Sequence, residues 1–272
     1  MHWTSRSPIS SAASKNQTRS PIYCTVRCNL WFAAVLVPRQ FGGGEVLLSE
    51  RRPRRSTFVF LVGAGLLLFV VLLLVGLAIS RYLGDDALGR MDRGLARYLA
   101  RNRSSGLNQI TEILSYLAET TTVVGLGVLL FFGARLTWKR WGDSLLVLAA
   151  LAGEAAIFLG LTALVDRNRP MVHKLDVAPP TSSFPSGHMA AAVVLYGVVA
   201  IIASRHLRSR AVVVLLWLVA IVVPLAVGAS RMYRGMHYLT DVVGGGVLGT
   251  VWLTVSTRAM APFRSRRSGR GG

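Results

Sequence analysis

Long runs of residues without a charged side chain dominate this sequence. The clearest run, residues 57–80, contains 24 consecutive residues with no Asp, Glu, Lys or Arg. At 1.5 Å per residue it would form a helix of roughly 36 Å, enough to cross the hydrocarbon core of a bilayer. Hydrophobic residues make up 52% of the chain and charged residues only 16%, and the apolar residues are grouped in long blocks. We therefore expect an all-α, polytopic membrane protein.

Five further apolar blocks follow the first, so the sequence predicts a six-helix transmembrane bundle. Glu112 and Glu119 lie near the start of the second block, and its first turns are expected to face water or protein rather than lipid. Residues 81–106 carry apolar side chains at helical spacing with charges between them, which predicts an amphipathic interfacial helix between spans 1 and 2. The six predicted spans are residues 57–80, 110–134, 144–165, 185–203, 211–229 and 238–256.

The distribution of basic residues predicts the orientation in the membrane. The net charge is +19, but the basic residues flank the apolar blocks instead of forming one stripe, so we expect a bilayer and no nucleic acid as partner. With the N-terminus inside, the inside segments carry 20 Lys and Arg and the outside segments 11. The positive-inside rule then places both termini in the cytoplasm. Basic tails and a single-chain bundle suggest a bacterial inner membrane.

The two ends of the chain lack the apolar blocks. Residues 1–50 are expected to be a disordered tail, or the result of an over-long start assignment, with a true start near Val46. Cys24 and Cys28 form a weak metal signal, because no His or Cys follows at zinc spacing, and we interpret them as incidental thiols. Residues 51–257 are predicted to form the six-span domain and residues 258–272 a basic cytoplasmic tail.

Three polar stretches interrupt the apolar blocks on what this topology makes one face of the membrane. They are residues 166–170, 184–188 and 230–241, and all three are predicted to be extracytoplasmic. Their convergence on one face, although they are far apart in the sequence, predicts a functional site there.

The third stretch contains a histidine and an aspartate at helical spacing. If the chain is helical near His237, Asp241 falls one turn later on the same face. Its carboxylate can accept one imidazole N–H and leave the other ring nitrogen with a free lone pair, as in a nucleophile or general base. Arg231 lies six residues earlier and can bind an anion beside that nitrogen. Taken alone, the stretch is equally compatible with a loop that has a capping aspartate and an interfacial histidine.

The other two stretches supply an anion site and cations. Pro185-Ser186-Gly187-His188 opens the fourth span, and a helix N-terminus with free N–H groups binds anions readily. His188 can donate a proton to a leaving oxygen. Arg167 and Arg169 lie two residues apart beside Pro170, which ends the third span, and together they form a rigid cationic surface.

Together these residues resemble the motifs of the type 2 phosphatidic acid phosphatase family, membrane lipid phosphatases that share a core with vanadium haloperoxidases. The family has a lysine followed after six residues by Arg-Pro, a Pro-Ser-Gly-His, and a Ser-Arg followed by His after five residues and Asp after three more. Ten specified positions match in the right order, and the resemblance covers about residues 57–257. The matching residues are Arg169-Pro170, Pro185-Ser186-Gly187-His188 and Ser230-Arg231 with His237 and Asp241.

The resemblance implies a mechanism without a metal or other cofactor. It implies that His237 attacks phosphorus while Asp241 orients it, that His188 protonates the leaving group, and that water then hydrolyses the phosphohistidine. The phosphate oxygens would be held by Arg169, Arg231, Ser186 and the Gly187 N–H. This sequence departs from the pattern in one place, because Thr162 stands where the family has its lysine. We expect Arg167 to supply the missing charge, with Lys174 and Arg234 as the alternatives.

Some polar and small residues are expected to have structural roles. Glu154 lies in the middle of the third span, too deep to touch the phosphate, and we expect it to be a hydrogen-bonded structural group. His173 is expected to be a loop residue. The small residues of the sixth span predict close helix packing; they are Gly244, Gly245, Gly246 and Gly249.

The predicted activity is hydrolysis of a lipid phosphate or diphosphate on the extracytoplasmic face. Polyprenyl diphosphate, such as undecaprenyl diphosphate, phosphatidic acid and phosphatidylglycerophosphate are all candidate substrates. A lipid phosphotransferase with the same phosphohistidine is one alternative. Another is a degenerate, non-enzymatic member that binds a lipid phosphate, for which Thr162 is the only support. The sequence leaves the oligomeric state open.

Overall fold

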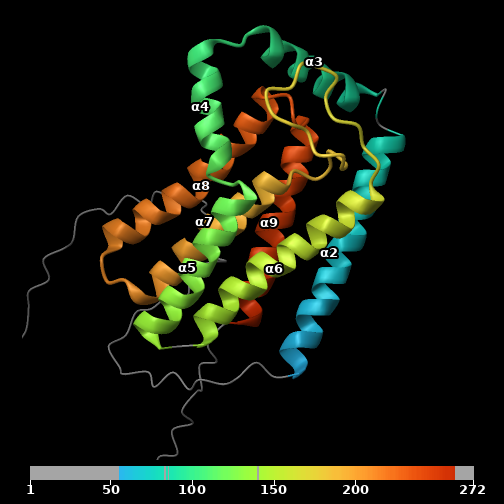
Figure 1. Ribbon diagram of the computed structural model, residues 1–272. Coiled ribbons are helices and arrows are strands. Elements are labelled where there is room, and N and C mark those ends of the chain that lie inside the picture. The colour runs from blue at the N-terminus through green and yellow to red at the C-terminus, as the bar shows by residue number, and fades with distance from the viewer. Residues whose placement is uncertain (1–54, 83, 85, 140, 261–272) are drawn as a thin grey trace, which may run out of the picture.

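The computed structural model describes residues 55–82, 84, 86–139 and 141–260, and the predictions about the N-terminal tail, its two cysteines and the end of the C-terminal tail lie outside these ranges. Every regular element in the described ranges is a helix. The helices are α2 (Arg55–Arg81), α3 (Ala87–Arg101), α4 (Ser105–Tyr116), α5 (Thr120–Trp138), α6 (Trp141–Leu164), α7 (Gly187–His206), α8 (Arg210–Tyr233) and α9 (Leu239–Ala259) (Figure 1).

Six of these helices, α2 and α5 to α9, are long and apolar enough to cross a membrane, which confirms the predicted fold class. Most large side chains of α2 point outward, including Phe58, Leu67 and Leu74, each more than 60% exposed. A soluble protein would bury such a surface, whereas a bilayer solvates it. The structure is therefore that of a multi-pass membrane protein.

Helix α7 lies at the centre of the bundle and is the most buried span. At one end it packs with α6 and α9 in a core that contains Leu146, Val194 and Leu253. Nearer its N-terminus, Ala190 joins a second core with Leu161 of α6 and residues of α2 and α9. The start of α7, where the Pro-Ser-Gly-His motif lies, is thus fixed by three neighbouring helices.

The glycines of α9 allow this close packing, as the sequence predicts. A Cβ on Gly245 would overlap the backbone carbonyl oxygen of Ser186, and one on Gly249 would lie 2.8 Å from the carbonyl oxygen of Ala190. Gly246 faces only the flexible end of the Met189 side chain. The backbone of α9 therefore lies directly against the first turn of α7.

The prediction of one continuous span over residues 110–134 is wrong. The chain breaks between Tyr116 and Thr120, so α4 ends and α5 begins within it. The N–H groups of Ala118 and Glu119 donate to carbonyls only three residues back, which closes α4 in a tight turn, and Glu119 is the residue before α5. Helix α4 then packs on α8 above the bundle (Figure 1).

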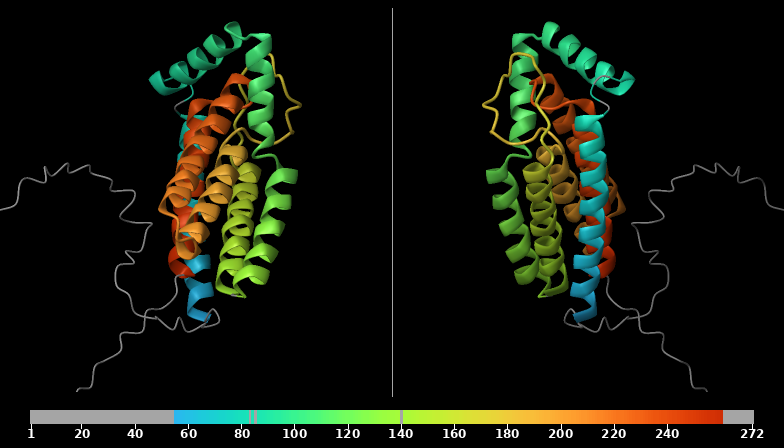
Figure 2. Two further views of the ribbon diagram at one scale, coloured as in Figure 1. Left: turned by 90° about the vertical axis from the view of Figure 1, so that its left-hand side faces the viewer. Right: turned by 90° about the vertical axis from the view of Figure 1, so that its right-hand side faces the viewer.

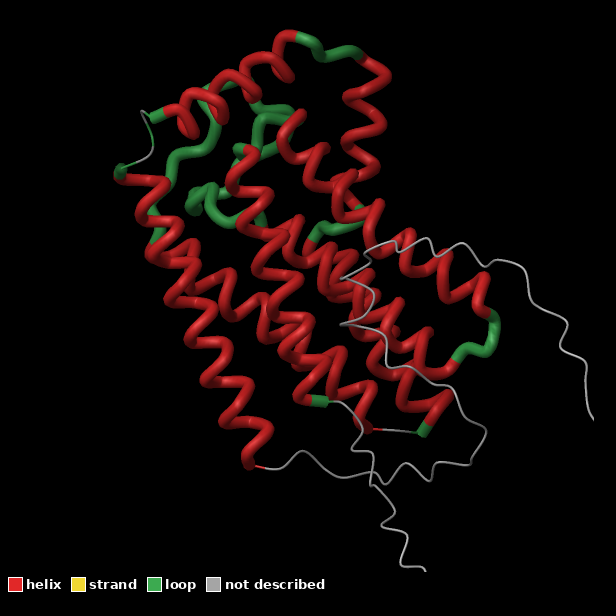
Figure 3. Tube along the Cα trace, turned by 180° about the vertical axis from the view of Figure 1, so that it is seen from behind, coloured by secondary structure: helices red, strands yellow, loops and turns green. Residues whose placement is uncertain are grey.

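The amphipathic segment is a shorter helix than predicted, Ala87–Arg101 rather than residues 81–106. It lies across one end of the bundle, beside the long loop 165–186 (Figures 1 and 2). Its buried face contains Gly89, Asp92 and Ala96, so it covers protein as well as presenting an exposed face. Seen from behind, loop 165–186 gathers at this same end, whereas α2 begins and α9 ends at the opposite one (Figure 3).

We predict that Gly245→Ala will lower the free energy of unfolding by about 1–3 kcal/mol, because a methyl group there overlaps backbone that cannot move aside. Thermal unfolding in detergent would measure the change. Gly246→Ala on the same helix is the matched control and should behave like the wild type. Equal unfolding temperatures for the two variants would contradict the packing described here.

Candidate active site

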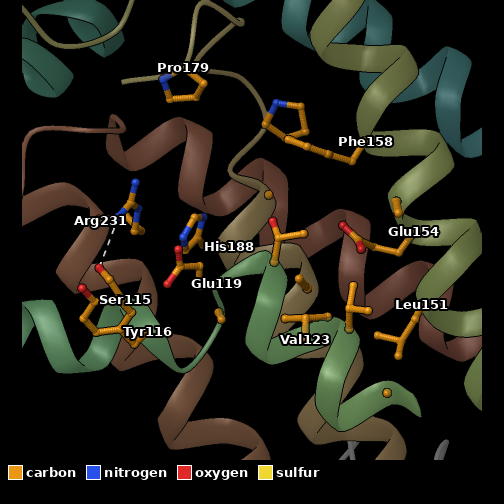
Figure 4. Close-up of a pocket in the computed structure, with 18 of the residues that line it drawn as sticks. Ser115, Tyr116, Glu119, Val123, Leu151, Glu154, Phe158, Pro179, His188 and Arg231 are labelled. Atoms are coloured by element: carbon orange, nitrogen blue, oxygen red, sulfur yellow. Dashed lines mark hydrogen bonds between the residues drawn. The ribbon is translucent and has the colours of Figure 1, made fainter. Parts of the chain in front are cut away.

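The three polar stretches of the sequence meet at one end of the bundle, around a single cavity of about 1230 Å³. Loop 165–186 contributes Arg169, the start of α7 contributes His188, the end of α8 contributes Arg231, and the turn before α9 contributes His237. The wall of the cavity continues between α5 and α6, where its lining is mostly apolar. Figure 4 shows His188 and Arg231 at one side of this cavity.

The first turn of α7 is held by the backbone of α9. The Ser186 N–H donates to the Asp241 carbonyl at 2.9 Å, which fixes the start of α7 against the start of α9. A Cβ on Gly187 would lie 2.7 Å from the Phe158 ring, so only glycine fits there. The Ser186 hydroxyl is buried and has no hydrogen-bond partner in the described structure. A free hydroxyl at a helix N-terminus beside a cavity is suited to bind an anion.

His237 is oriented by a backbone carbonyl that the sequence analysis did not identify. Its Nδ1 lies 2.8 Å from the Ser183 carbonyl oxygen, and because a carbonyl only accepts, Nδ1 must carry the hydrogen. Nε2 is then the nitrogen with the free lone pair. The predicted hydrogen bond to Asp241 is not formed, since the nearest carboxylate oxygen lies 3.9 Å from Nδ1. No residue pattern reveals this acceptor, because any residue at position 183 has a carbonyl group.

The protonation state of His237 follows from its surroundings. The side chain is almost completely buried. Burial, reinforced by the positive charges of Arg169 and Arg231, lowers the pKa of His237 well below its usual value of 6.5. The imidazole is therefore neutral at neutral pH, which is the form that can act as a nucleophile.

Asp241 instead belongs to a buried ion cluster. Its carboxylate accepts a hydrogen bond from the Tyr238 N–H at 2.8 Å and one from Arg167 Nη1. Arg167 Nη2 donates at 2.8 Å to Asp92 of α3, which also accepts from the Thr240 N–H at 3.3 Å. Arg167 therefore joins α3, loop 165–186 and α9, and it does not line the cavity where the sequence analysis placed it.

Arg169 and Arg231 both face the cavity, as expected from the sequence. Arg169 Nη1 donates to the Met236 carbonyl at 3.0 Å, and Arg231 Nη1 donates to Ser115 at 3.3 Å. The Nε atom of each is buried without a hydrogen-bond partner in the described structure. Unsatisfied buried donors are costly, so a group that accepts from both arginines would be stabilised here.

Asp176 and Arg234 also belong to the site; Arg234 was expected only as an alternative cation, and Asp176 was not expected. Asp176 of loop 165–186 accepts from Arg231 Nη1 at 2.7 Å and from Arg234 Nε at 2.8 Å. Burial alone would raise the pKa of Asp176, but its bonds to Arg234 and the charge of Arg231 outweigh burial and lower it. The sequence gives little indication of either residue. Arg234 follows the Ser-Arg motif by three residues but is not part of it, and Asp176 lies in a loop.

Four further residues considered from the sequence are Thr162, Lys174, His173 and Glu154. The Thr162 hydroxyl donates back to Leu159 of its own helix, and neither Thr162 nor Lys174 lines the cavity. His173 is an exposed loop residue, as expected. Glu154 differs from the expectation: it lines the same cavity as His188, and no hydrogen-bond partner is found for it among the described residues. In the described ranges, no group of three or more His, Cys, Asp or Glu side chains converges as a metal site.

We predict that Arg167→Ala will destabilise the protein by about 3–5 kcal/mol, because it leaves two buried carboxylates, Asp92 and Asp241, without their cation. Thermal unfolding at pH 7 would measure this. The deficit should shrink on acidification, since protonated carboxyl groups need no counter-ion. Asn168→Ala, an exposed neighbour, is the control. A wild-type unfolding temperature for Arg167→Ala would show that the cluster contributes nothing to stability.

Three comparisons with known proteins agree with this geometry. Residues 143–265 match the model of the PAP2 superfamily. Over 188 residues the chain is 29% identical to phosphatidylglycerophosphatase B of Bacillus subtilis. This match covers 66% of this chain and 88% of that protein. The crystal structure of a transmembrane PAP2-type phosphatidylglycerolphosphate phosphatase from Bacillus subtilis superposes with a TM-score of 0.65 at 28% identity, covering 75% of this chain and 99% of that one. The residues that match the PAP2 superfamily contain the motifs gathered around this cavity, and the chain is a membrane lipid phosphate phosphatase.

Proposed function

We propose that this enzyme hydrolyses a lipid phosphate monoester through a phosphohistidine formed on His237. The observation that carries the proposal is the state of that imidazole. It is neutral, its Nδ1 hydrogen is bound to a backbone carbonyl, and its Nε2 is left free in a cavity lined by Arg169 and Arg231. A fixed nucleophile beside unsatisfied cationic donors is suited to attack on phosphorus.

The proposed reaction has two steps. In the first, Nε2 of His237 forms a bond to phosphorus, the bond from phosphorus to the lipid oxygen breaks, and His188 gives its proton to that oxygen. In the second, water attacks the phosphohistidine, the phosphorus–nitrogen bond breaks, and His188 takes up the proton of the water. The Asp241 carboxylate, 3.9 Å from Nδ1, favours the positive charge that the ring acquires in between.

The phosphate oxygens are proposed to bind Arg169, Arg231, Ser186 and the Gly187 N–H. Arg169, Arg231 and Gly187 line the cavity. The buried Nε atoms of both arginines and the hydroxyl of Ser186, the residue before Gly187, have no hydrogen-bond partner among the described residues. Charge develops on these oxygens in the transition state, so donors held in place beforehand accelerate the reaction. Arg167 is given a different role from the one predicted: it positions Asp241 rather than touching phosphate. The substitute for the family lysine is then Arg234, which lines the cavity.

Phosphatidylglycerophosphate is the substrate we favour. The relatives named above are phosphatidylglycerophosphate phosphatases, and the apolar wall between α5 and α6 is suited to acyl chains. Phosphatidic acid and undecaprenyl diphosphate are the comparison substrates.

The test is phosphate release from a panel of lipid phosphates by purified enzyme. We expect turnover of phosphatidylglycerophosphate by the wild type and none by His237→Ala, because the nucleophile is gone. His188→Ala should retain activity on a substrate whose leaving group needs no protonation, such as an aryl phosphate, and lose about 10²-fold or more on an alkyl phosphate.

Two results would count against the mechanism. Equal losses for both histidine variants on good and poor leaving groups would refute the division into nucleophile and acid. Trapping of ³²P on a residue other than His237 after an acid-free quench would refute the phosphohistidine itself.

We further propose that the site faces away from the cytoplasm. The start of α2 and the end of α9 lie at the opposite end of the bundle from the site (Figure 1). The excess of basic residues favours a cytoplasmic location for that opposite end. The N- and C-terminal ends would then both be cytoplasmic.

Cysteine labelling tests this orientation. In a variant without Cys24 and Cys28, Pro180→Cys on the exposed part of loop 165–186 should react with an impermeant thiol reagent in intact cells. Arg208→Cys, exposed between α7 and α8, should react only after permeabilisation. The reverse pattern would invert the proposed topology.

A further inference from the structure

Glu154 is a buried acidic residue without a partner. It lies in the middle of α6 and is only 4% exposed. No hydrogen bond or ion pair joins it to another described residue. Polar groups inside a membrane protein are usually paired, or else they take part in function.

The Glu154 carboxyl group faces the same cavity as the proposed catalytic residues. Leu151 and Phe158, one turn away on either side along α6, also line this cavity. Figure 4 shows Glu154 pointing into it, across from His188 and Arg231. An unpaired polar group in an otherwise apolar wall is positioned for a ligand rather than for the protein.

The depth of Glu154 is set by Phe158. The Phe158 ring packs on Gly187, at the level of the proposed phosphate site. Glu154 precedes Phe158 by four residues, so it lies about one helical turn, roughly 6 Å, deeper along α6. A ligand group that reaches Glu154 must therefore sit a few bonds beyond the phosphate, on the lipid side.

The surroundings also define the chemistry of that ligand group. Val123 of α5 and Leu151 of α6 are among its neighbours in the cavity, and neither offers a charge. A carboxyl group among such side chains in a bilayer is stable in its neutral form. A neutral carboxyl group donates one hydrogen bond, and its natural partner in an apolar cavity is a carbonyl oxygen.

We propose that Glu154 is a specificity-determining residue that donates a hydrogen bond to an acyl ester carbonyl of bound phosphatidic acid. The ester groups of phosphatidic acid lie a few bonds beyond its phosphate, whereas a polyprenyl phosphate has only hydrocarbon there. The residue thus favours phosphatidic acid over polyprenyl phosphates. This inference rests on the proposed function, because it concerns the lipid bound at the same site.

The experiment compares kcat/KM on three substrates: diacyl phosphatidic acid, its dialkyl ether analogue and undecaprenyl phosphate. Glu154→Leu should lose about tenfold on the diacyl lipid, since one hydrogen bond to a buried carbonyl is removed. It should lose little on the ether and nothing on the polyprenyl phosphate. Glu154→Gln, which keeps an N–H donor of similar size, should retain most of the diacyl activity.

The other outcomes overturn the proposal in distinguishable ways. Equal losses by Glu154→Leu on all three substrates would mean that the residue has a structural role. No loss on any substrate would mean that its carboxyl group binds only water. Either result refutes the ester contact without refuting the lipid phosphatase activity. A wild-type enzyme that is inactive on all three lipids refutes this inference, and one that is also inactive on phosphatidylglycerophosphate refutes the proposed function with it.

Discussion

The ion cluster centred on Arg167 joins the parts of the chain on which the site depends. Its guanidinium group lies between Asp92 of α3 and Asp241 of α9, and both carboxylates are almost fully buried. Neither carboxylate would be stable there without a cation, and the arginine would not be stable without them. The cluster therefore fixes the loop that carries Arg169 relative to the helix that follows His237. It also explains why α3, which lies far from the motifs in the sequence, covers this end of the bundle.

Backbone groups complete what the ion cluster begins. The Ser186 N–H is bound to the Asp241 carbonyl, and the His237 ring is bound to the Ser183 carbonyl. Both bonds depend on the close approach of α7 and α9 that Gly245 allows. Since backbone positions are fixed by the packing of whole helices, His237 keeps its orientation without a dedicated side-chain partner.

The sequence predicted those features that depend on residue type and spacing. Uncharged runs define the six spans, and the positions of the motifs at the ends of those spans predict that His188, Arg169, Arg231 and His237 meet. Features that depend on unpatterned contacts were not predictable. The break near Glu119 arises from a local turn inside an apolar block, and the carbonyl that orients His237 belongs to a residue of any type.

Arg167 shows how two equivalent residues in a sequence can differ in space. Arg167 and Arg169 are two residues apart in a segment without helix or strand, so their side chains leave the backbone in different directions. Asp92 decides which of them is drawn away from the cavity, and nothing in the local pattern indicates that a residue 75 positions earlier is the partner. Spacing alone therefore predicts a cationic surface but not which cation binds the ligand.

The polarity of the cavity matches a ligand that is itself half polar and half apolar. At the end formed by helix termini, buried arginine and hydroxyl donors remain unsatisfied, and His237 remains neutral. In a site of low dielectric such donors interact with a phosphate far more strongly than they would in water. Along α5 and α6 the wall is hydrocarbon, except at Thr120 and Glu154. A soluble phosphate ester would fill only the first part of this cavity. A lipid phosphate would fill both parts, and its apolar portion would keep water from the arginines during phosphoryl transfer.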